Sequence, residues 1–254
     1  MANTPKMFTR DNGAAIAYHK SEGDGPSNRP GVVFLGGFMS DMEGTKAVAL
    51  EAHCQQQGRA YLRFDYQGHG QSSGEFTEGT IGQWSDDAID VLDALTEGPQ
   101  ILVGSSMGGW IMLLAALSRP ERVAGLVGIA AAPDFTEALM WKGFSSEIRE
   151  TLQRDRVYYA PSEYADQPYA ITMELIEDGR TQLLLDKAID FDGPVHLFQG
   201  IVDDAVPWEH ALTISRQLTS NNVTTTLIKD GDHRLSREED LSKIFAAVDR
   251  LTSH

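Results

Sequence analysis

Short, continuous apolar runs recur along the chain, and longer amphipathic segments separate them. A strand that is buried on both faces shows no polar alternation, so we predict these runs as strands. The predicted strands are 31–35, 59–64, 100–103, 123–130, 195–199 and 223–228, and the predicted helices are 43–57, 81–95, 107–118, 208–218 and 238–251. This alternation of strands and helices predicts an α/β fold, with a mostly parallel sheet between layers of helices.

Local signals add two details to this pattern. Asp11, Asn12 and Gly13 form a turn signal, which predicts a hairpin over residues 7–20. Thr80 stands directly before helix 81–95, where a hydroxyl accepts a hydrogen bond from a free backbone N–H and caps the helix.

Residues 134–192 break the alternation of strands and helices. The segment predicts several helices and no convincing strand, and it is rich in large apolar side chains such as Trp141. A lid over a binding pocket would have this composition, although the same side chains would also serve to pack the segment on the main domain. We therefore expect residues 1–133 and 193–254 to form an α/β core and residues 134–192 to form a helical cap.

The chain of 254 residues carries 21 Lys and Arg against 37 Asp and Glu, a formal net charge of −16. An acidic surface repels nucleic acids and anionic membranes, so neither is expected as a partner. Acyl-CoA is an unfavourable substrate for the same reason, unless basic residues of the cap relieve the repulsion locally. The basic residues in question are Lys142, Arg149, Arg154 and Arg156.

Cys54 is the only cysteine, which excludes an intrachain disulfide and a zinc site made of several cysteines. The first residues lack a charged segment followed by an apolar one, so we expect no secretory signal. The longest apolar run, 110–117, is too short to span a bilayer. These features predict a cytoplasmic protein without a membrane partner, and they leave a homodimer open.

The stretch Gly104-Ser105-Ser106-Met107-Gly108 matches Gly-x-Ser-x-Gly, the pattern of a sharp turn that presents a nucleophilic serine. A predicted strand precedes it and a predicted helix follows it, as the pattern requires. Only Ser106 has a glycine at both flanking offsets, so it is the candidate nucleophile. The alternative is a glycine-rich turn without chemistry, and partners elsewhere in the chain decide between the two.

A serine nucleophile needs a base that takes its proton and an acid that orients the base, here in the chain order serine, acid, histidine. His233 follows the predicted strand 223–228 and comes after Ser106 in the chain. His69 also lies past a strand end, but it precedes the serine, and the other histidines fall in the hairpin, in helices, within a strand or at the last position. We therefore predict His233 as the base.

Asp203 and Asp204 both follow the predicted strand 195–199, at the edge where open α/β sheets place their sites. Asp203 leaves the strand first, so we predict that it orients His233 and that Asp204 caps the turn or the next helix.

A tetrahedral intermediate needs backbone donors for its oxyanion. We expect these donors to be the N–H of Met107, directly after the nucleophile, and the N–H of Phe38, in the loop after strand 31–35. We expect Phe38, Met107, Trp141 and Trp208 to wall the substrate pocket, which should suit a short-to-medium acyl or aryl group. This chemistry requires no metal and no organic cofactor.

Together these residues resemble the α/β-hydrolase superfamily over nearly the whole chain. Segments 34–46, 63–66, 98–110, 203–208 and 232–234 are similar to one branch, which includes a mitochondrial acyl-protein thioesterase that also cleaves acyl glucuronides, and its bacterial relatives. The resemblance implies Ser106, Asp203 and His233 as a triad, a helical cap, and activity on acyl esters or thioesters. The His-Gly pair common in the oxyanion loop is Gly36-Gly37 here, which keeps the backbone donor and loses any contact of the histidine.

The residues therefore predict a serine hydrolase for a small-molecule acyl ester or thioester. Two alternatives stay open. Enzymes with the same triad cleave C–C bonds or transfer acyl groups, although the His-x4-Asp pattern of acyltransferases is not met, because Glu238 stands at that offset from His233. The other alternative is a ligand receptor that has kept the hydrolase fold.

Overall fold

The computed structural model describes residues 4–24, 29–160 and 168–251. The strands of its main sheet are β1 (Lys6–Thr9), β2 (Ala15–Ser21), β3 (Gly31–Leu35), β4 (Tyr61–Phe64), β5 (Gln100–Ser105), β6 (Val123–Ile129), β9 (Val195–Gly200) and β10 (Val223–Ile228). They lie in the order β1-β2-β4-β3-β5-β6-β9-β10. β2 is antiparallel to β1 and to β4, and the pairs from β4 to β10 are parallel. The predicted α/β fold and the hairpin before it are confirmed.

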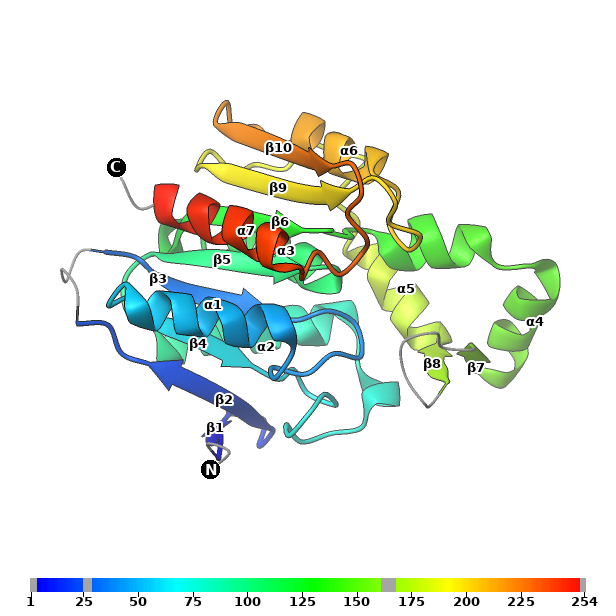
Figure 1. Cartoon of the computed structure of the whole chain (residues 1–254). Coiled ribbons are helices and arrows are strands. Elements are labelled where there is room, and N and C mark those ends of the chain that lie inside the picture. Colours follow the sequence, from blue (N-terminus) through cyan, green and yellow to red (C-terminus); the bar gives the residue numbers. More distant parts are fainter. Residues whose placement is uncertain (1–3, 25–28, 161–167, 252–254) are drawn as a thin grey trace.

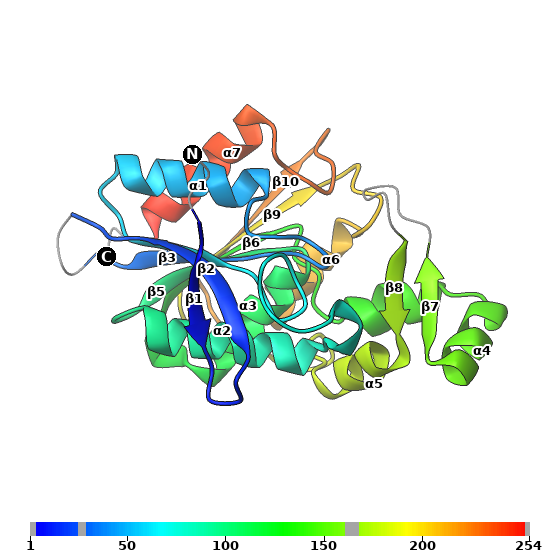
Figure 2. The same cartoon turned by 90° about the horizontal axis from the view of Figure 1, so that it is seen from below.

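Five helices of the described chain cover the two faces of this sheet (Figures 1 and 2). They are α1 (Thr45–Gln56), α2 (Ile81–Leu95), α3 (Met107–Ser118), α6 (Glu209–Gln217) and α7 (Glu238–Arg250), with 3-10 turns at Phe76–Glu78 and Pro120–Arg122. α1 and α7 pack on one face, and α2, α3 and α6 share the core of the other. Thr80 caps α2 as predicted, because its hydroxyl accepts a hydrogen bond of 3.2 Å from Gln83 N–H.

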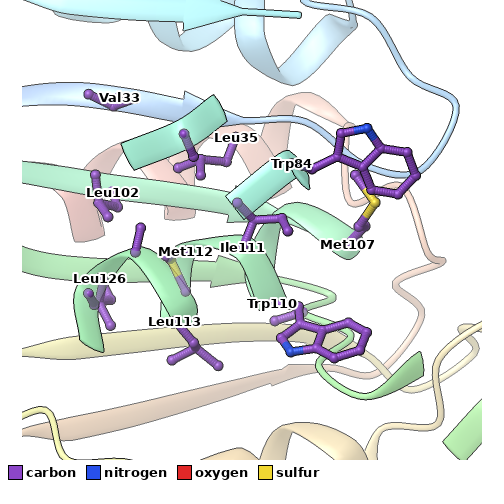
Figure 3. Packing of buried hydrophobic residues seen from close by; sticks show 14 of the residues in the cluster. Val33, Leu35, Trp84, Leu102, Met107, Trp110, Ile111, Met112, Leu113 and Leu126 are labelled. Atoms are coloured by element: carbon purple, nitrogen blue, oxygen red, sulfur yellow. The ribbon is translucent and has the colours of Figure 1, made fainter. Parts of the chain in front are cut away.

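α3 is apolar on all sides, because it lies between the sheet and α2. Ile111, Met112 and Leu113 are all 0% exposed. They belong to one buried cluster with Leu35 of β3 and Leu102 of β5, which Figure 3 shows. This packing holds α3 firmly, and it thereby positions the residue just before the helix, Ser106.

Residues between β6 and β9 form the predicted insertion, which extends sideways from the sheet (Figure 1). It contains a π-helical turn (Thr136–Trp141), α4 (Ser146–Asp155), β7 (Val157–Ala160), β8 (Tyr169–Thr172) and α5 (Met173–Thr181). Leu152, Ile171, Met173 and Ile176 form a small core within it.

The expectation of a cap without strands was wrong, because β7 and β8 pair as an antiparallel ribbon. Each of these strands is four residues long. A run of this length is too short for a period of two residues to be distinguished from a helical turn, so the pattern carried no strand signal.

Within the described ranges, no helix is both long enough and apolar enough to cross a bilayer.

Candidate active site

The backbone turns sharply at Ser106, between β5 and α3. Ser106 has φ 55° and ψ −119°, a strained conformation for a residue with a side chain. A Cβ on Gly108 would overlap the carbonyl oxygen of Leu35, and a Cβ on Gly104 would overlap that of Gly108. The glycines of the motif are thus required by close backbone contact, and the turn presents Ser106 at the carboxyl edge of the sheet.

The structure brings Ser106, Asp203 and His233 together from three different loops. His233 Nδ1 lies 2.9 Å from Asp203 Oδ2, and His233 Nε2 lies 3.1 Å from Ser106 Oγ. An ionised carboxylate only accepts, so Nδ1–H donates to Asp203 and Nε2 is left to accept the hydroxyl proton of Ser106. The histidine is therefore oriented with its basic nitrogen toward the serine.

The carboxylate of Asp203 is fully buried and surrounded by donors. Its Oδ1 accepts hydrogen bonds from the N–H groups of Ala205 (2.9 Å) and Val206 (2.8 Å), and its Oδ2 accepts one from Gln199 Nε2 (2.8 Å). Burial opposes the charge, but the hydrogen bond from His233, together with those from the two backbone donors, holds the pKa of Asp203 below its ordinary value. The adjacent Asp204 is exposed to solvent.

His69 lies away from this site. It is 4% exposed, and its ring packs edge-on against Tyr66, Phe76 and Trp84. Burial lowers the pKa of His69 to about 4, although a hydrogen bond to the carbonyl of Gln67 works in the other direction. Its ring is therefore neutral near neutral pH and packs as a core side chain.

The N–H groups of Phe38 and Met107 have no protein acceptor among the described residues. Met107 N–H is at the first position of α3, where the helix offers no partner. The loop that carries Phe38 is held by Asp65, whose Oδ1 accepts a hydrogen bond of 2.7 Å from Met42 N–H and whose Oδ2 accepts one of 2.8 Å from Gln71 N–H. Both donors are thus free and lie on an anchored backbone.

A cavity of about 570 Å³ opens beside Ser106 and His233. Its apolar wall combines residues of the core and of the insertion: Phe38, Met107, Phe135, Leu139, Met140, Tyr169 and Ile171. The Phe38 ring connects the two parts, because it packs against Phe76 at 4.9 Å on one side and against Phe135 at 5.7 Å and Tyr169 at 6.2 Å on the other. The insertion therefore supplies part of the cavity wall.

The expectation that Trp141 and Trp208 wall the cavity was wrong, because neither is among the residues that line it. The ring of Trp141 lies 5.5 Å from the guanidinium carbon of Arg149 and 4.7 Å from that of Arg180. Trp208 is half-buried directly before α6. Residue size alone indicated Trp141, but the direction of the π-helical turn places the preceding Leu139 and Met140 on the cavity instead.

The basic residues of the cap do not line the cavity either. Arg154 pairs with Asp155 and Arg156 pairs with Glu177 on the surface, while Arg149 donates to the carbonyl of Trp141.

The cavity instead contains Lys46 and Arg234, which sequence reasoning missed. They are 188 residues apart in the chain, and the Nζ of Lys46 donates to the carbonyl of Arg234 at 2.5 Å. No local sequence motif contains both residues, so the sequence alone did not predict this contact.

Comparison with known proteins places this geometry in a family. Residues 26–174 match the family described as serine aminopeptidase, S33. "Palmitoyl-protein thioesterase ABHD10, mitochondrial" from Bos taurus is 38% identical over 237 residues, which cover 93% of this chain and 76% of the relative. That name places the relative in mitochondria, so the cytoplasmic location of this chain stays a prediction.

Solved structures agree with this placement. A putative hydrolase from Agrobacterium vitis superposes with a TM-score of 0.92 and 37% identity, over 99% of this chain and 98% of the other. α/β-Hydrolase domain-containing protein 10 from mouse superposes with a TM-score of 0.88 and 35% identity, over 98% of both chains. The chain belongs to the serine aminopeptidase S33 family with the α/β-hydrolase fold, and it is a hydrolase of the esterase and thioesterase kind.

Proposed function

We propose that the chain cleaves carboxylic esters or thioesters through an acyl-enzyme on Ser106. The observation that carries the proposal is the continuous hydrogen-bonded series from Asp203 through His233 to Ser106 Oγ, with separations of 2.9 and 3.1 Å. Such a series activates a serine that is otherwise a weak nucleophile.

In the first half of the reaction, Ser106 Oγ attacks the acyl carbon while His233 Nε2 takes the hydroxyl proton. Asp203 stabilises the imidazolium that forms, and the N–H groups of Phe38 and Met107 bind the oxyanion. The tetrahedral intermediate collapses with cleavage of the C–O or C–S bond, and His233 passes its proton to the leaving alcohol or thiol.

In the second half, His233 takes a proton from water, and the resulting hydroxide attacks the acyl carbon of the acyl-enzyme. A second oxyanion forms in the same site. Its collapse breaks the bond to Ser106 Oγ, which recovers the proton from His233, and the carboxylic acid leaves. The residues named here complete this cycle without a cofactor.

The apolar wall of the cavity supports an apolar acyl group, since aliphatic and aromatic side chains from both the core and the cap meet there. The relative from Bos taurus is named a palmitoyl-protein thioesterase. For this chain we propose a small-molecule acyl ester or thioester as substrate. Its acyl length can be measured with p-nitrophenyl esters from acetyl to palmitoyl.

The test is Ser106→Ala, with the adjacent Ser105→Ala as the matched control. We expect Ser106→Ala to lose p-nitrophenyl butyrate turnover by roughly three or more orders of magnitude and to lose labelling by a fluorophosphonate probe. Ser105→Ala should still be labelled. Substantial turnover by Ser106→Ala would contradict the proposal, and a wild-type protein that resists the probe would point to a receptor.

Product analysis with an added alcohol separates hydrolysis from acyl transfer. A hydrolase yields the free acid as its main product, whereas an acyltransferase yields the new ester.

A further inference from the structure

The cavity beside Ser106 has a second wall, which is polar. Ser40, Asp41, Thr45, Lys46, Arg234 and Ser236 form it, from the loop before α1, the start of α1 and the loop after β10. A Cβ placed on Gly37 would lie 3.0 Å from Ser40 Oγ and 3.4 Å from Ser106 Cβ. This polar wall therefore begins next to the nucleophile.

Lys46 is the half-buried cation of the polar wall. Its Nζ donates to the carbonyl of Arg234, and no carboxylate of the described chain lies within ion-pair distance of it. Burial lowers the pKa of Lys46 to about 8, and the attraction of Asp232 offsets this only in part. An ammonium group has three donors, so Lys46 has capacity for a further acceptor inside the cavity.

The start of α1 adds donors to the same wall. The N–H groups of Thr45, Lys46 and Ala47 have no protein acceptor in the described chain, and all three residues line the cavity. Gly44, the N-cap, offers no side chain, and the first turn holds no acidic residue. Free N–H groups and the helix dipole favour an anion at such an end.

The carboxylates in and beside the polar wall make their contacts with groups other than Lys46. Asp41 lies at the exposed rim, where its Oδ1 accepts from Glu43 N–H at 2.9 Å. Glu43 is itself held by Arg63 at 2.7 Å and by His19 at 3.2 Å. Asp232 Oδ1 accepts from the N–H groups of Arg234 and Leu235. His233 is directed toward Ser106 and Asp203. None of the three carboxylates therefore neutralises Lys46 by direct contact.

We propose that the polar wall is a leaving-group subsite, in which Lys46 and the first N–H groups of α1 bind a carboxylate or phosphate on the alcohol or thiol part of the substrate. The acyl part then lies along the apolar wall, and the scissile bond lies between the two walls at Ser106. This inference rests on the proposed ester and thioester hydrolysis, and it specifies the class of leaving group.

The experiment compares thioesters with the same butyryl group and different thiols at about pH 7, where Lys46 carries its proton. One pair is S-butyryl mercaptopropionate and the neutral S-butyryl mercaptopropionamide. The other is S-butyryl phosphopantetheine and S-butyryl pantetheine. The first pair reports on a carboxylate close to the scissile bond, and the second on a phosphate farther away.

The expected preference in kcat/KM is roughly tenfold for the anionic member of at least one pair, as for one hydrogen bond to a charged group. Lys46→Met should bring this ratio to about one by lowering kcat/KM for the anionic thioester more than for its neutral partner. Lys46→Arg should retain most of the preference. The matched control is Lys229→Met, since Lys229 is exposed and outside the cavity, and it should leave the ratio unchanged.

The subsite is refuted if wild type shows no preference in either pair, or if Lys46→Met keeps the preference. In that case the proposed hydrolysis would still be supported if wild type turned over the neutral thioesters and Ser106→Ala did not. A protein that turns over none of the four thioesters would overturn the subsite, and its turnover of p-nitrophenyl butyrate then decides whether the proposed hydrolysis stands. Competitive inhibition by free mercaptopropionate, weakened in Lys46→Met, gives a second measure that does not depend on turnover.

Discussion

Replacing Asp203 with asparagine removes one acceptor oxygen from a carboxylate on which four N–H donors converge. Two of them, Ala205 and Val206, lie on Oδ1, and the other two, Gln199 Nε2 and His233 Nδ1, lie on Oδ2. An amide with its oxygen at the Oδ1 position keeps both backbone bonds and turns its NH₂ group toward His233. The reverse orientation loses both backbone bonds, so the first is the one we expect.

An NH₂ group facing His233 Nδ1 forces that nitrogen to be the acceptor. The ring proton then sits on Nε2, which faces Ser106 Oγ at 3.1 Å and can no longer take the hydroxyl proton. The wrong tautomer in a serine triad lowers kcat by roughly 10⁴, about 5 kcal/mol at 1.36 kcal/mol per decade. Loss of a hydrogen bond to a charged group should also lower the free energy of unfolding by about 1.5–3 kcal/mol.

The assay is the initial rate of p-nitrophenyl butyrate hydrolysis by wild type, Asp203→Asn and Asp204→Asn. Asp204 is the matched control, because it is the adjacent carboxylate and is exposed. We expect Asp204→Asn to stay within about threefold of wild type, as for surface substitutions away from a site. An Asp203→Asn rate within tenfold of wild type, or an equal loss in Asp204→Asn, would refute the assignment of the acid.

The charge of Asp203 also predicts a pH dependence of stability. Its pKa in the folded protein lies below the ordinary value of 3.8, so its contribution is fully present above that value and is lost as pH falls through the folded pKa. The difference in unfolding free energy between wild type and Asp203→Asn should therefore shrink in acid. Urea unfolding at a series of pH values measures this, and a difference that grew in acid would contradict the sign.

Two further predictions concern the sharp turn at Ser106 and the cap. Gly108→Ala should destabilise the fold by about 1–3 kcal/mol and lower kcat more than tenfold, because its Cβ would push α3 away from the carbonyl of Leu35. Thermal unfolding measures the loss of stability, and p-nitrophenyl butyrate turnover measures the loss of kcat. Trp141→Leu should lower the stability of the cap by about 1 kcal/mol, because the stacking on two guanidinium groups is lost, and should leave the acyl-length preference unchanged. Met140→Ala should shift that preference toward longer p-nitrophenyl esters. A shift in Trp141→Leu and none in Met140→Ala would contradict the cavity wall described above.

The sheet, its covering helices and the sharp turn at Ser106 were predictable because their signals are local. Continuous apolar runs, a helix cap at Thr80 and glycines at fixed offsets each report on a few consecutive residues. The meeting of Ser106, Asp203 and His233 was also predictable, since each follows a predicted strand and the carboxyl ends of parallel strands lie at one edge of the sheet.

Three features were decided only by the tertiary structure. The ribbon of β7 and β8 forms between strands too short to show their period. The choice of Met140 over Trp141 for the cavity depends on how the π-helical turn is directed.

The third feature is the polar wall, where a contact between Lys46 and Arg234 joins the start of α1 to the loop after β10. The chain by itself determined the fold and the candidate nucleophile, because periodicity and turn chemistry act over a few residues. Only the folded chain decided which walls the substrate meets, because strand order and helix direction bring together side chains that no local pattern connects.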